Sequence, residues 1–285
     1  MPLPQQRMLY VGRQPPREEE HKIRHHKTSS AWIVVEMKRW AGRVALVTGA
    51  SAGIGASVAR RLVAEGMKVV AVARRIDRLQ AMGNELKGKP GTLIPIKCDL
   101  TKDDQVLSMF AQIKRDLGGV DVCVNNAGFC IPNDLLKGSP KEWRDMLDLN
   151  VVALCLCTRE AVASMRERGV DDGHIFHINS IGGHRVSNNT SLNFYSGTKH
   201  MVTMLTEALR RELKTSNIRI TSISPGLVET EFVISSGFSE EMSKQIYSKM
   251  PSIQADDITN TLIHVLSAPP NVQVHEVIVI PTKTD

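Results

Sequence analysis

The sequence predicts an α/β protein of the Rossmann type, a single domain built on a doubly wound parallel sheet. Three observations support this prediction. Short apolar segments alternate with helical patterns, a glycine-rich turn joins the first strand to the first helix, and no linker interrupts the chain after residue 40. This alternation is typical of βαβ units, whose parallel sheet is covered by helices on both faces. With 285 residues, the chain is long enough to bury one large core.

Each element follows from the spacing of its apolar residues. A continuous apolar run of roughly 4–8 residues indicates a buried strand, whereas apolar residues at helical spacing indicate a helix. Strands are predicted at residues 44–47, 68–73, 93–98, 120–124, 174–179, 218–223 and 274–280. Helices are predicted at residues 54–65, 77–86, 103–117, 141–168, 194–215 and 255–267. Right-handed crossovers then bring the carboxyl ends of the strands to one edge of the sheet, where ligands bind.

Residues 1–36 follow neither pattern. They combine several prolines with an acidic run, Glu18 to Glu20, and a basic stretch, His21 to Lys27. We expect this segment to be disordered. A targeting arm, or an arm that binds acidic surfaces, is the alternative. Residues 37–285 form the expected single domain.

The composition limits the possible partners. A net charge of +6 suits an anionic cofactor but is too small to require nucleic acid, and aromatic residues make up only 4%. No apolar run approaches the roughly 20 residues of a membrane-spanning helix. We therefore expect neither a nucleic-acid partner nor a membrane span.

The cysteines and histidines indicate a reducing compartment and no metal site. The five cysteines, an odd number, show no C-x-x-C spacing, which favours reduced thiols over a disulfide framework or a zinc site, and a cytoplasmic location. Three histidines surround one predicted strand: His174, His177 and His184. Metal ligation requires a shared face and tight geometry, so we interpret each as a structural histidine.

The turn after the first strand is typical of a phosphate-binding loop. Gly49 allows the tight turn, Gly53 allows the backbone to approach a pyrophosphate, and Gly55 allows the helix and strand to pack closely. Free N–H groups at the start of the helix then face the phosphates. The predicted contacts are Gly49, Ser51, Ala52, Gly53, Ile54 and Gly55. The alternative is a glycine-rich helix entry that binds nothing.

The end of the second strand predicts which cofactor binds. NAD-binding folds place an acidic residue there, on the ribose 2′-hydroxyl, but this chain has Arg74 and Arg75. Guanidinium groups accommodate a 2′-phosphate, so the predicted cofactor is NADP(H). The alternative is a basic helix start on the surface. Asp99, after the third strand, is placed to meet the adenine edge, with a helix N-cap as its alternative role.

Four residues are candidates for catalysis. Tyr195 and Lys199 are four residues apart in a predicted helix and so share one face, where the ammonium group is expected to lower the pKa of the phenol. Ser180 follows a strand at the ligand edge and could bind a carbonyl oxygen beside Tyr195. Asn150, inside a helix, could hold a water that links Lys199 to solvent. The alternative roles are a helix-surface pair for Tyr195 and Lys199, a turn or cap serine for Ser180, and a buried structural asparagine for Asn150.

Together these residues resemble the short-chain dehydrogenase/reductase family. The similarity covers about residues 38–285 and comprises several motifs in the family's order. The matching residues are Thr48 to Gly55, Asn125 to Gly128, the tetrad Asn150, Ser180, Tyr195 and Lys199, Pro225-Gly226, and Thr230. There is one departure within the domain. Ser180 precedes Tyr195 by 15 residues, whereas the family's serine more often stands where this chain has Gly182.

The resemblance implies further contacts and an activity. It places Asn126 at the cofactor ribose, Arg74, Arg75, Asp99 and Leu100 at the adenosine end, and Val228 and Thr230 at the nicotinamide amide. Tyr195 would donate a proton to the substrate oxygen, Ser180 would polarise the carbonyl, and Lys199 and Asn150 would reprotonate Tyr195 through water. Similarity to members that reduce ketones implies NADPH-dependent reduction of 3-keto and 17-keto steroids, with isoprenoid alcohols of the farnesol type as the alternative. Helices 141–168 and 194–215 imply a homodimer or homotetramer.

The substrate walls are expected from residues 129–136, 184–194 and 231–250. The last segment is rich in apolar residues and is interpreted as a lid, which favours small lipophilic carbonyl or alcohol substrates. Ordinary packing of an amphipathic helix is the alternative. Two other classes of function stay open: a catalytically silent protein that senses NADPH and binds a partner, and a nucleic-acid-binding role for the basic arm.

Overall fold

A seven-stranded parallel sheet forms the centre of the protein, which a computed structural model describes over residues 37–283. The prediction for residues 1–36 lies outside the described residues. The sheet order is β3-β2-β1-β4-β5-β6-β9. Its strands are β1 (Val44–Thr48), β2 (Lys68–Ala73), β3 (Thr92–Lys97), β4 (Val122–Asn125), β5 (His174–Ile178), β6 (Arg219–Pro225) and β9 (Glu276–Val279). The predicted doubly wound sheet is therefore confirmed. The strand order reverses between β1 and β4, where such sheets bind ligands.

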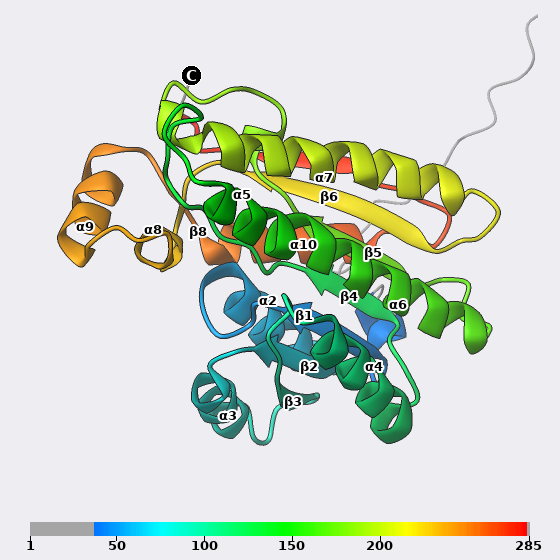
Figure 1. Cartoon of the computed structure of the whole chain (residues 1–285). Helices are drawn as coiled ribbons and strands as arrows, with labels where there is room; N and C mark the ends of the chain where they lie inside the picture. The colour runs from blue at the N-terminus through cyan, green and yellow to red at the C-terminus, as the bar shows by residue number, and fades with distance from the viewer. Residues whose placement is uncertain (1–36, 284–285) are drawn as a thin grey trace, which may run out of the picture.

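Helices cover both faces of the sheet (Figure 1). One core lies under α2 (Gly53–Ala64), α3 (Ile76–Glu85) and α10 (Ala255–Ser267). The other lies under α4 (Asp103–Leu117), α6 (Leu154–Glu167) and α7 (Asn193–Glu212). Successive residues of β2 alternate between the two, with Val69 in the first core and Val70 in the second. Both faces are apolar, which explains why the strands read as continuous apolar runs.

The predicted helix over residues 141–168 is interrupted. It consists of α5 (Pro140–Leu147), a π-helical turn (Asp148–Ala153) and α6. The wider turn holds Asn150, which is 1% exposed. π-helical turns occur mainly inside α-helices and often at functional sites. An extra residue in one turn leaves the apolar pattern nearly unchanged, so the sequence did not predict it.

The segment between β6 and α10 contains two short helices. They are α8 (Phe232–Ser235) and α9 (Glu240–Lys249), and both stand out from the body of the fold in Figure 1. The strands β7 (Val228–Glu229) and β8 (Ile253–Gln254) pair at the base of this segment. We call residues 230–250 the lid. None of the helices in the described part of the chain has the length and apolarity that a bilayer crossing requires.

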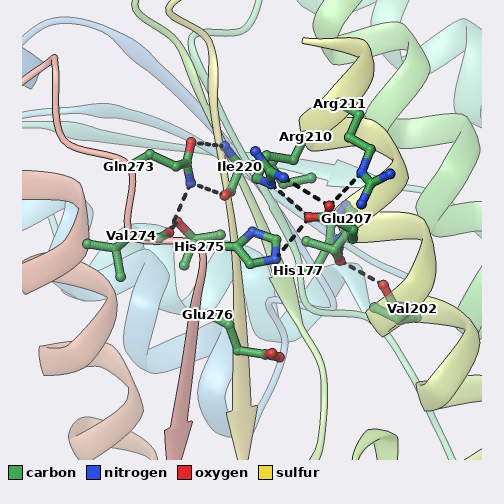
Figure 2. Close-up of polar contacts among 12 residues, drawn as sticks. His177, Val202, Glu207, Arg210, Arg211, Ile220, Gln273, Val274, His275 and Glu276 are labelled. Atoms are coloured by element: carbon green, nitrogen blue, oxygen red, sulfur yellow. Dashed lines mark hydrogen bonds and ion pairs between the residues drawn. The ribbon is translucent and has the colours of Figure 1, made fainter. Parts of the chain in front are cut away.

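Side chains tie the last strand to its neighbours (Figure 2). Gln273 exchanges hydrogen bonds with the backbone N–H and carbonyl of Ile220. His275 Nε2 lies 3.4 Å from Glu207 Oε2 on α7. Hydrogen bonds from Arg210 and Arg211 lower the pKa of Glu207 to about 2, so this carboxylate stays charged. These contacts hold the segment that leads into β9 against β6 and α7 at the edge of the sheet.

A buried histidine on β5 links this strand with β4, α6 and α7. His177 Nδ1 lies 2.9 Å from Thr206 Oγ1, and its Nε2 lies 3.1 Å from Thr158 Oγ1. Thr206 donates its proton to the carbonyl of Val202, and Thr158 accepts from Asn125 Nδ2. Thr206 must therefore accept from Nδ1, so the imidazole is the neutral Nδ1–H tautomer.

This network predicts acid sensitivity. Burial, with a smaller contribution from Lys199, lowers the pKa of His177 to about 3, below the unfolded value of about 6.5. Between these values the unfolded chain binds more protons, so stability is full above about pH 6.5 and falls as the pH decreases. We expect the titration of His177 to lower the free energy of unfolding by on the order of 2 kcal/mol as the pH falls from 6.5 to 5. Urea unfolding should show a weaker pH dependence for His177→Phe than for the wild type. The exposed control His264→Asn should keep the full dependence, and equal slopes for wild type and His177→Phe would contradict this account.

Candidate active site

A cleft of about 1500 Å³ opens at the carboxyl ends of the strands. It is lined by nearly all the residues that the sequence singled out. They are Gly49, Ser51, Ala52, Gly53, Ile54, Arg74, Arg75, Asp99, Leu100, Asn126, Ser180, Tyr195, Lys199, Val228 and Thr230. Gly55 and Asn150 lie just behind this lining, so the structure brings the predicted residues together around one cavity.

The glycine loop has the backbone that its sequence predicts. Gly49 and Gly53 adopt φ values of +66° and +55°, which residues with a Cβ rarely adopt. A Cβ at Gly55 would lie 2.5 Å from Asn126 Nδ2 and 2.6 Å from the Gly49 carbonyl oxygen, so Gly55 serves close packing. Among the described residues, no side chain caps the start of α2 and its first turn holds no acid. Its N–H groups therefore suit an anionic ligand.

Thr48 and Asn126 fasten the glycine loop to β4. Thr48 Oγ1 accepts hydrogen bonds from the backbone N–H groups of Asn126 (2.9 Å) and Ala127 (3.0 Å). Asn126 Nδ2 donates to the Thr48 carbonyl at 2.9 Å. Asn126 thus lines the cleft while its amide braces the loop. The bracing role of Thr48 was not predicted, although its place before Gly49 in the motif was a signal.

Two arginines, Arg74 and Arg75, follow β2 and line the cleft. Arg75 donates from Nε (3.1 Å) and Nη2 (3.0 Å) to Ser51 Oγ, and its Nη1 lies 3.0 Å from Glu231 Oε2. Asp99 Oδ1 accepts from the N–H and hydroxyl of Thr101, so it shapes a turn rather than capping α4. Glu231 was missed by sequence reasoning, because 156 residues separate it from Arg75.

Ser180 lies beside Tyr195 in spite of its unusual spacing. The Ser180 side chain interacts with the phenol of Tyr195, and its Oγ accepts a hydrogen bond from the Gly182 N–H at 3.1 Å. Ser180 has extended backbone and caps a short 3-10 turn, Ile181–Gly183. His184, after this turn, lies 2.9 Å from Ser224 Oγ and 3.0 Å from Glu276 Oε1. The contacts of His184 anchor the start of the loop that joins Ser180 to Tyr195.

Burial determines the protonation of Tyr195. Burial, with a smaller contribution from Cys130, raises the pKa of Tyr195 well above its usual value, and the Ser180 hydrogen bond only partly offsets this. Lys199 Nζ lies 5.9 Å from the ring centroid and donates to the Ile178 carbonyl at 2.9 Å. The prediction that Lys199 lowers the pKa of Tyr195 is therefore wrong for the chain by itself. The phenol is protonated at neutral pH, which is the form that a proton donor needs.

Lys199 and Asn150 approach each other at a glycine. Burial lowers the pKa of Lys199 to about 8. Asn150 Oδ1 accepts from the Phe129 N–H at 3.0 Å, and its Nδ2 donates to the Phe129 carbonyl and to Thr198 Oγ1. A Cβ at Gly128 would lie 3.2 Å from Asn150 Oδ1 and 3.7 Å from Lys199 Nζ. Gly128 thus leaves space where the two polar groups converge.

The lid lies beside the end of the cleft that holds Tyr195. The Phe232 and Tyr195 ring centroids are 5.8 Å apart. Tyr247 on α9 donates its hydroxyl to the carbonyls of Val228 (3.1 Å) and Thr230 (3.0 Å), which fixes the base of the lid. The predicted walls line the cleft only in part: residues 129–136 contribute Phe129 alone, residues 184–194 contribute 185–189 and Leu192, and residues 231–250 contribute Glu231, Phe232, Ser235, Tyr247 and Met250. The apolar lid residues divide, however. Phe232 and Met250 line the cleft, whereas Ile234 and Met242 do not, although all four side chains are exposed.

Comparison with known proteins agrees with this geometry. The short chain dehydrogenase family matches residues 43–241. Dehydrogenase/reductase SDR family member 11 from Gallus gallus is 52% identical over 87% of this chain and 99% of its own length. The Homo sapiens protein of that name is 48% identical, covering 87% and 97%. Farnesol dehydrogenase from Aedes aegypti is 43% identical, covering 86% and 98%.

Solved structures show the same fold. A short-chain type dehydrogenase/reductase from Mycobacterium marinum superposes with a TM-score of 0.78 at 30% identity, covering 87% of this chain and 97% of its own. A serine dehydrogenase complexed with NADP⁺ superposes with a TM-score of 0.77 at 30% identity, covering 85% and 96%.

Proposed function

The chain belongs to the short-chain dehydrogenase/reductase family, and from this we propose that it is an NADP(H)-dependent oxidoreductase. Its reaction is the reduction of ketones on lipophilic substrates to alcohols, or the reverse. One observation carries the proposal. The half-buried phenol of Tyr195, beside Ser180 and one helical turn from Lys199, faces the same cleft as the glycine loop and two arginines.

The residues present fit a dinucleotide with a 2′-phosphate. Gly49 and Gly53 give a loop that lets backbone approach a pyrophosphate, and the uncapped N–H groups of α2 supply donors. At the end of β2 the chain offers Arg74 and Arg75, where an acidic residue would favour a 2′-hydroxyl. The related serine dehydrogenase in complex with NADP⁺ adds support.

The chain's own residues then divide the work of proton transfer. NADP(H), when bound, supplies or accepts the hydride. Tyr195 donates its proton to the substrate oxygen, and Ser180 polarises the carbonyl through its hydroxyl. Lys199, near Asn150 across Gly128, reprotonates Tyr195 through water. The ammonium group of Lys199, which lines the cleft, would also hold the nicotinamide ribose.

The substrate class is lipophilic, and keto-steroids are the leading candidates. Apolar side chains at the catalytic end, among them Phe129, Phe232 and Met250, support a hydrophobic substrate. Similarity to dehydrogenase/reductase SDR family member 11 supports an oxidation or reduction reaction. Similarity to the Aedes aegypti farnesol dehydrogenase favours isoprenoid alcohols as a second candidate. The unpaired, mostly buried cysteines suit a reducing compartment such as the cytoplasm.

A panel of ketones and alcohols, tested with NADPH and with NADH, examines the proposal. We expect ketone-dependent oxidation of NADPH, with steroid and isoprenoid substrates preferred over sugars. A protein that binds NADPH tightly yet turns over no member of the panel would instead be a catalytically silent sensor. The cofactor absorbance distinguishes the two outcomes directly.

We also propose that the chain assembles as a homodimer or homotetramer through its long helices. Met201 and Met204 lie one turn apart on α7 and are 44% and 59% exposed. Light scattering should show an oligomer for the wild type and a smaller species for Met204→Glu. A control, Leu107→Glu, changes a comparably exposed residue on α4 and should not alter the mass. A monomeric wild type would contradict the proposal.

A further inference from the structure

Glu231 connects the lid to the adenosine end of the cleft. It stands directly before α8, and its carboxylate bridges Arg75 and Arg78 at the start of α3. Its Oε2 lies 3.0 Å from Arg75 Nη1, and its Oε1 lies 2.7 Å from Arg78 Nη1. All three side chains are roughly half exposed, so solvent ions and ligands can reach them.

The contacts of Arg75 use both hydrogen-bonding edges of its guanidinium group. Nε and Nη2 donate to Ser51 Oγ, and Nη1 donates to Glu231. A phosphate binds arginine best through two parallel hydrogen bonds along one such edge. Any bidentate phosphate contact must therefore displace Ser51 or Glu231 from Arg75. Ser51 is neutral and belongs to the phosphate loop, whereas Glu231 is an anion.

Glu231 and a 2′-phosphate carry charge of the same sign. Partial burial alone would raise the pKa of Glu231, but hydrogen bonds from Arg78 and Arg75 hold it below its usual value. The carboxylate is therefore ionised at neutral pH. A phosphate monoester carries about −1.5 to −2 charges at that pH. Two such anions on one guanidinium repel each other, so occupancy of Arg75 by one disfavours the other.

The neighbours of Glu231 reach both functional ends of the cleft. A Cβ at Gly53, in the glycine loop, would lie 3.1 Å from the side chain of Thr230. Phe232 packs near the ring of Tyr195. The ion pairs of Glu231 therefore fix the start of a lid that contacts the phosphate loop on one side and the phenol on the other.

Resting on the proposed NADP(H) function, we propose that Glu231 is a specificity-determining residue whose carboxylate competes with the cofactor's 2′-phosphate for Arg75. Binding of NADP(H) would replace the Glu231 carboxylate on Arg75 by the 2′-phosphate of the cofactor. NAD(H), with a 2′-hydroxyl, makes no such exchange and leaves the bridge to the lid intact. Glu231 thereby reduces the preference for NADP(H) over NAD(H) that Arg74 and Arg75 provide.

The test compares Glu231→Gln with a matched control, Glu229→Gln. Glu229 lies two residues earlier and accepts a hydrogen bond from Gln254 Nε2. Calorimetric titration would measure the affinity of each folded variant for adenosine 2′,5′-bisphosphate, adenosine 5′-monophosphate, NADPH and NADH. We expect Glu231→Gln to bind the bisphosphate and NADPH about threefold to fivefold more tightly than the wild type, the size of an exposed charge interaction. Affinity for the other two ligands should be unchanged, and the control should match the wild type throughout.

Three results would overturn the competition. Weaker NADPH binding by Glu231→Gln would mean that Glu231 orients Arg75 for the phosphate. Equal changes for NADPH and NADH would mean that the substitution only loosens the lid. No difference from Glu229→Gln would mean that the bridge has no role in cofactor binding. Arg75→Ala separates these from a failure of the proposed function. If Arg75→Ala leaves NADPH affinity unchanged, the proposed NADP(H) preference fails. If it weakens NADPH binding while Glu231→Gln has no effect, only the competition fails.

Discussion

Tyr195→Phe should lower kcat for ketone reduction by about 10²-fold to 10⁴-fold, the range that a positioned general acid contributes. The substitution removes one hydroxyl and leaves the ring, so its packing against Phe232 is kept. The hydroxyl is the group that meets Ser180, and burial keeps it protonated at neutral pH. The loss should appear in kcat because the proton is transferred in the chemical step. Steady-state kinetics with NADPH and a saturating ketone measures it.

NADPH affinity is the control for this variant. We expect Tyr195→Phe to bind NADPH within about twofold of the wild type, since most of the cofactor contacts are expected from other residues. The thermal midpoint should also stay close to that of the wild type. A variant that folds, binds NADPH and retains most of its kcat would show that another group supplies the proton.

Replacing Arg74 and Arg75 together by alanine should weaken NADPH binding by about 10-fold to 100-fold. Hydrogen bonds between charged groups contribute roughly 1.5–3 kcal/mol, and 1.4 kcal/mol corresponds to a factor of ten. NADH lacks the phosphate, so its affinity should change little. Arg60→Ala is the matched control, because Arg60 pairs with Glu85 at 2.7 Å and lies outside the lining of the cleft. Equal losses for the two cofactors in the double variant would contradict a 2′-phosphate site.

The central sheet was predictable because both of its faces are buried. Each strand is a short apolar run between helical patterns, and the predicted positions lie within a few residues of those observed. The π-helical turn at Asn150 was not predictable, since one extra residue per turn barely disturbs an apolar pattern. The helices of the lid were also missed. α8 has only four residues, too few for a period to appear, and an amphipathic helix such as α9 was considered only as the alternative for this segment.

The candidate site followed from local motifs, but its electrostatics did not. The spacing of Tyr195 and Lys199 placed both in the cleft, yet burial rather than the lysine governs the pKa of the phenol. Burial depends on packing from distant segments, which spacing does not report. Glu231 is the same kind of case. Its partners Arg75 and Arg78 are brought to it only by the fold.

Transfer of a labelled hydride tests the central claim most directly. The wild-type protein would be incubated with a lipophilic ketone and NADPH in which both hydrogens on the hydride-donating carbon are replaced by deuterium, and the alcohol would be analysed by mass spectrometry. We expect one deuterium in the product, on the carbon that bore the carbonyl, and at least about 100-fold less product from Tyr195→Phe in the same time under the same conditions. An unlabelled alcohol, or equal labelled product from both proteins, would contradict hydride transfer assisted by this phenol.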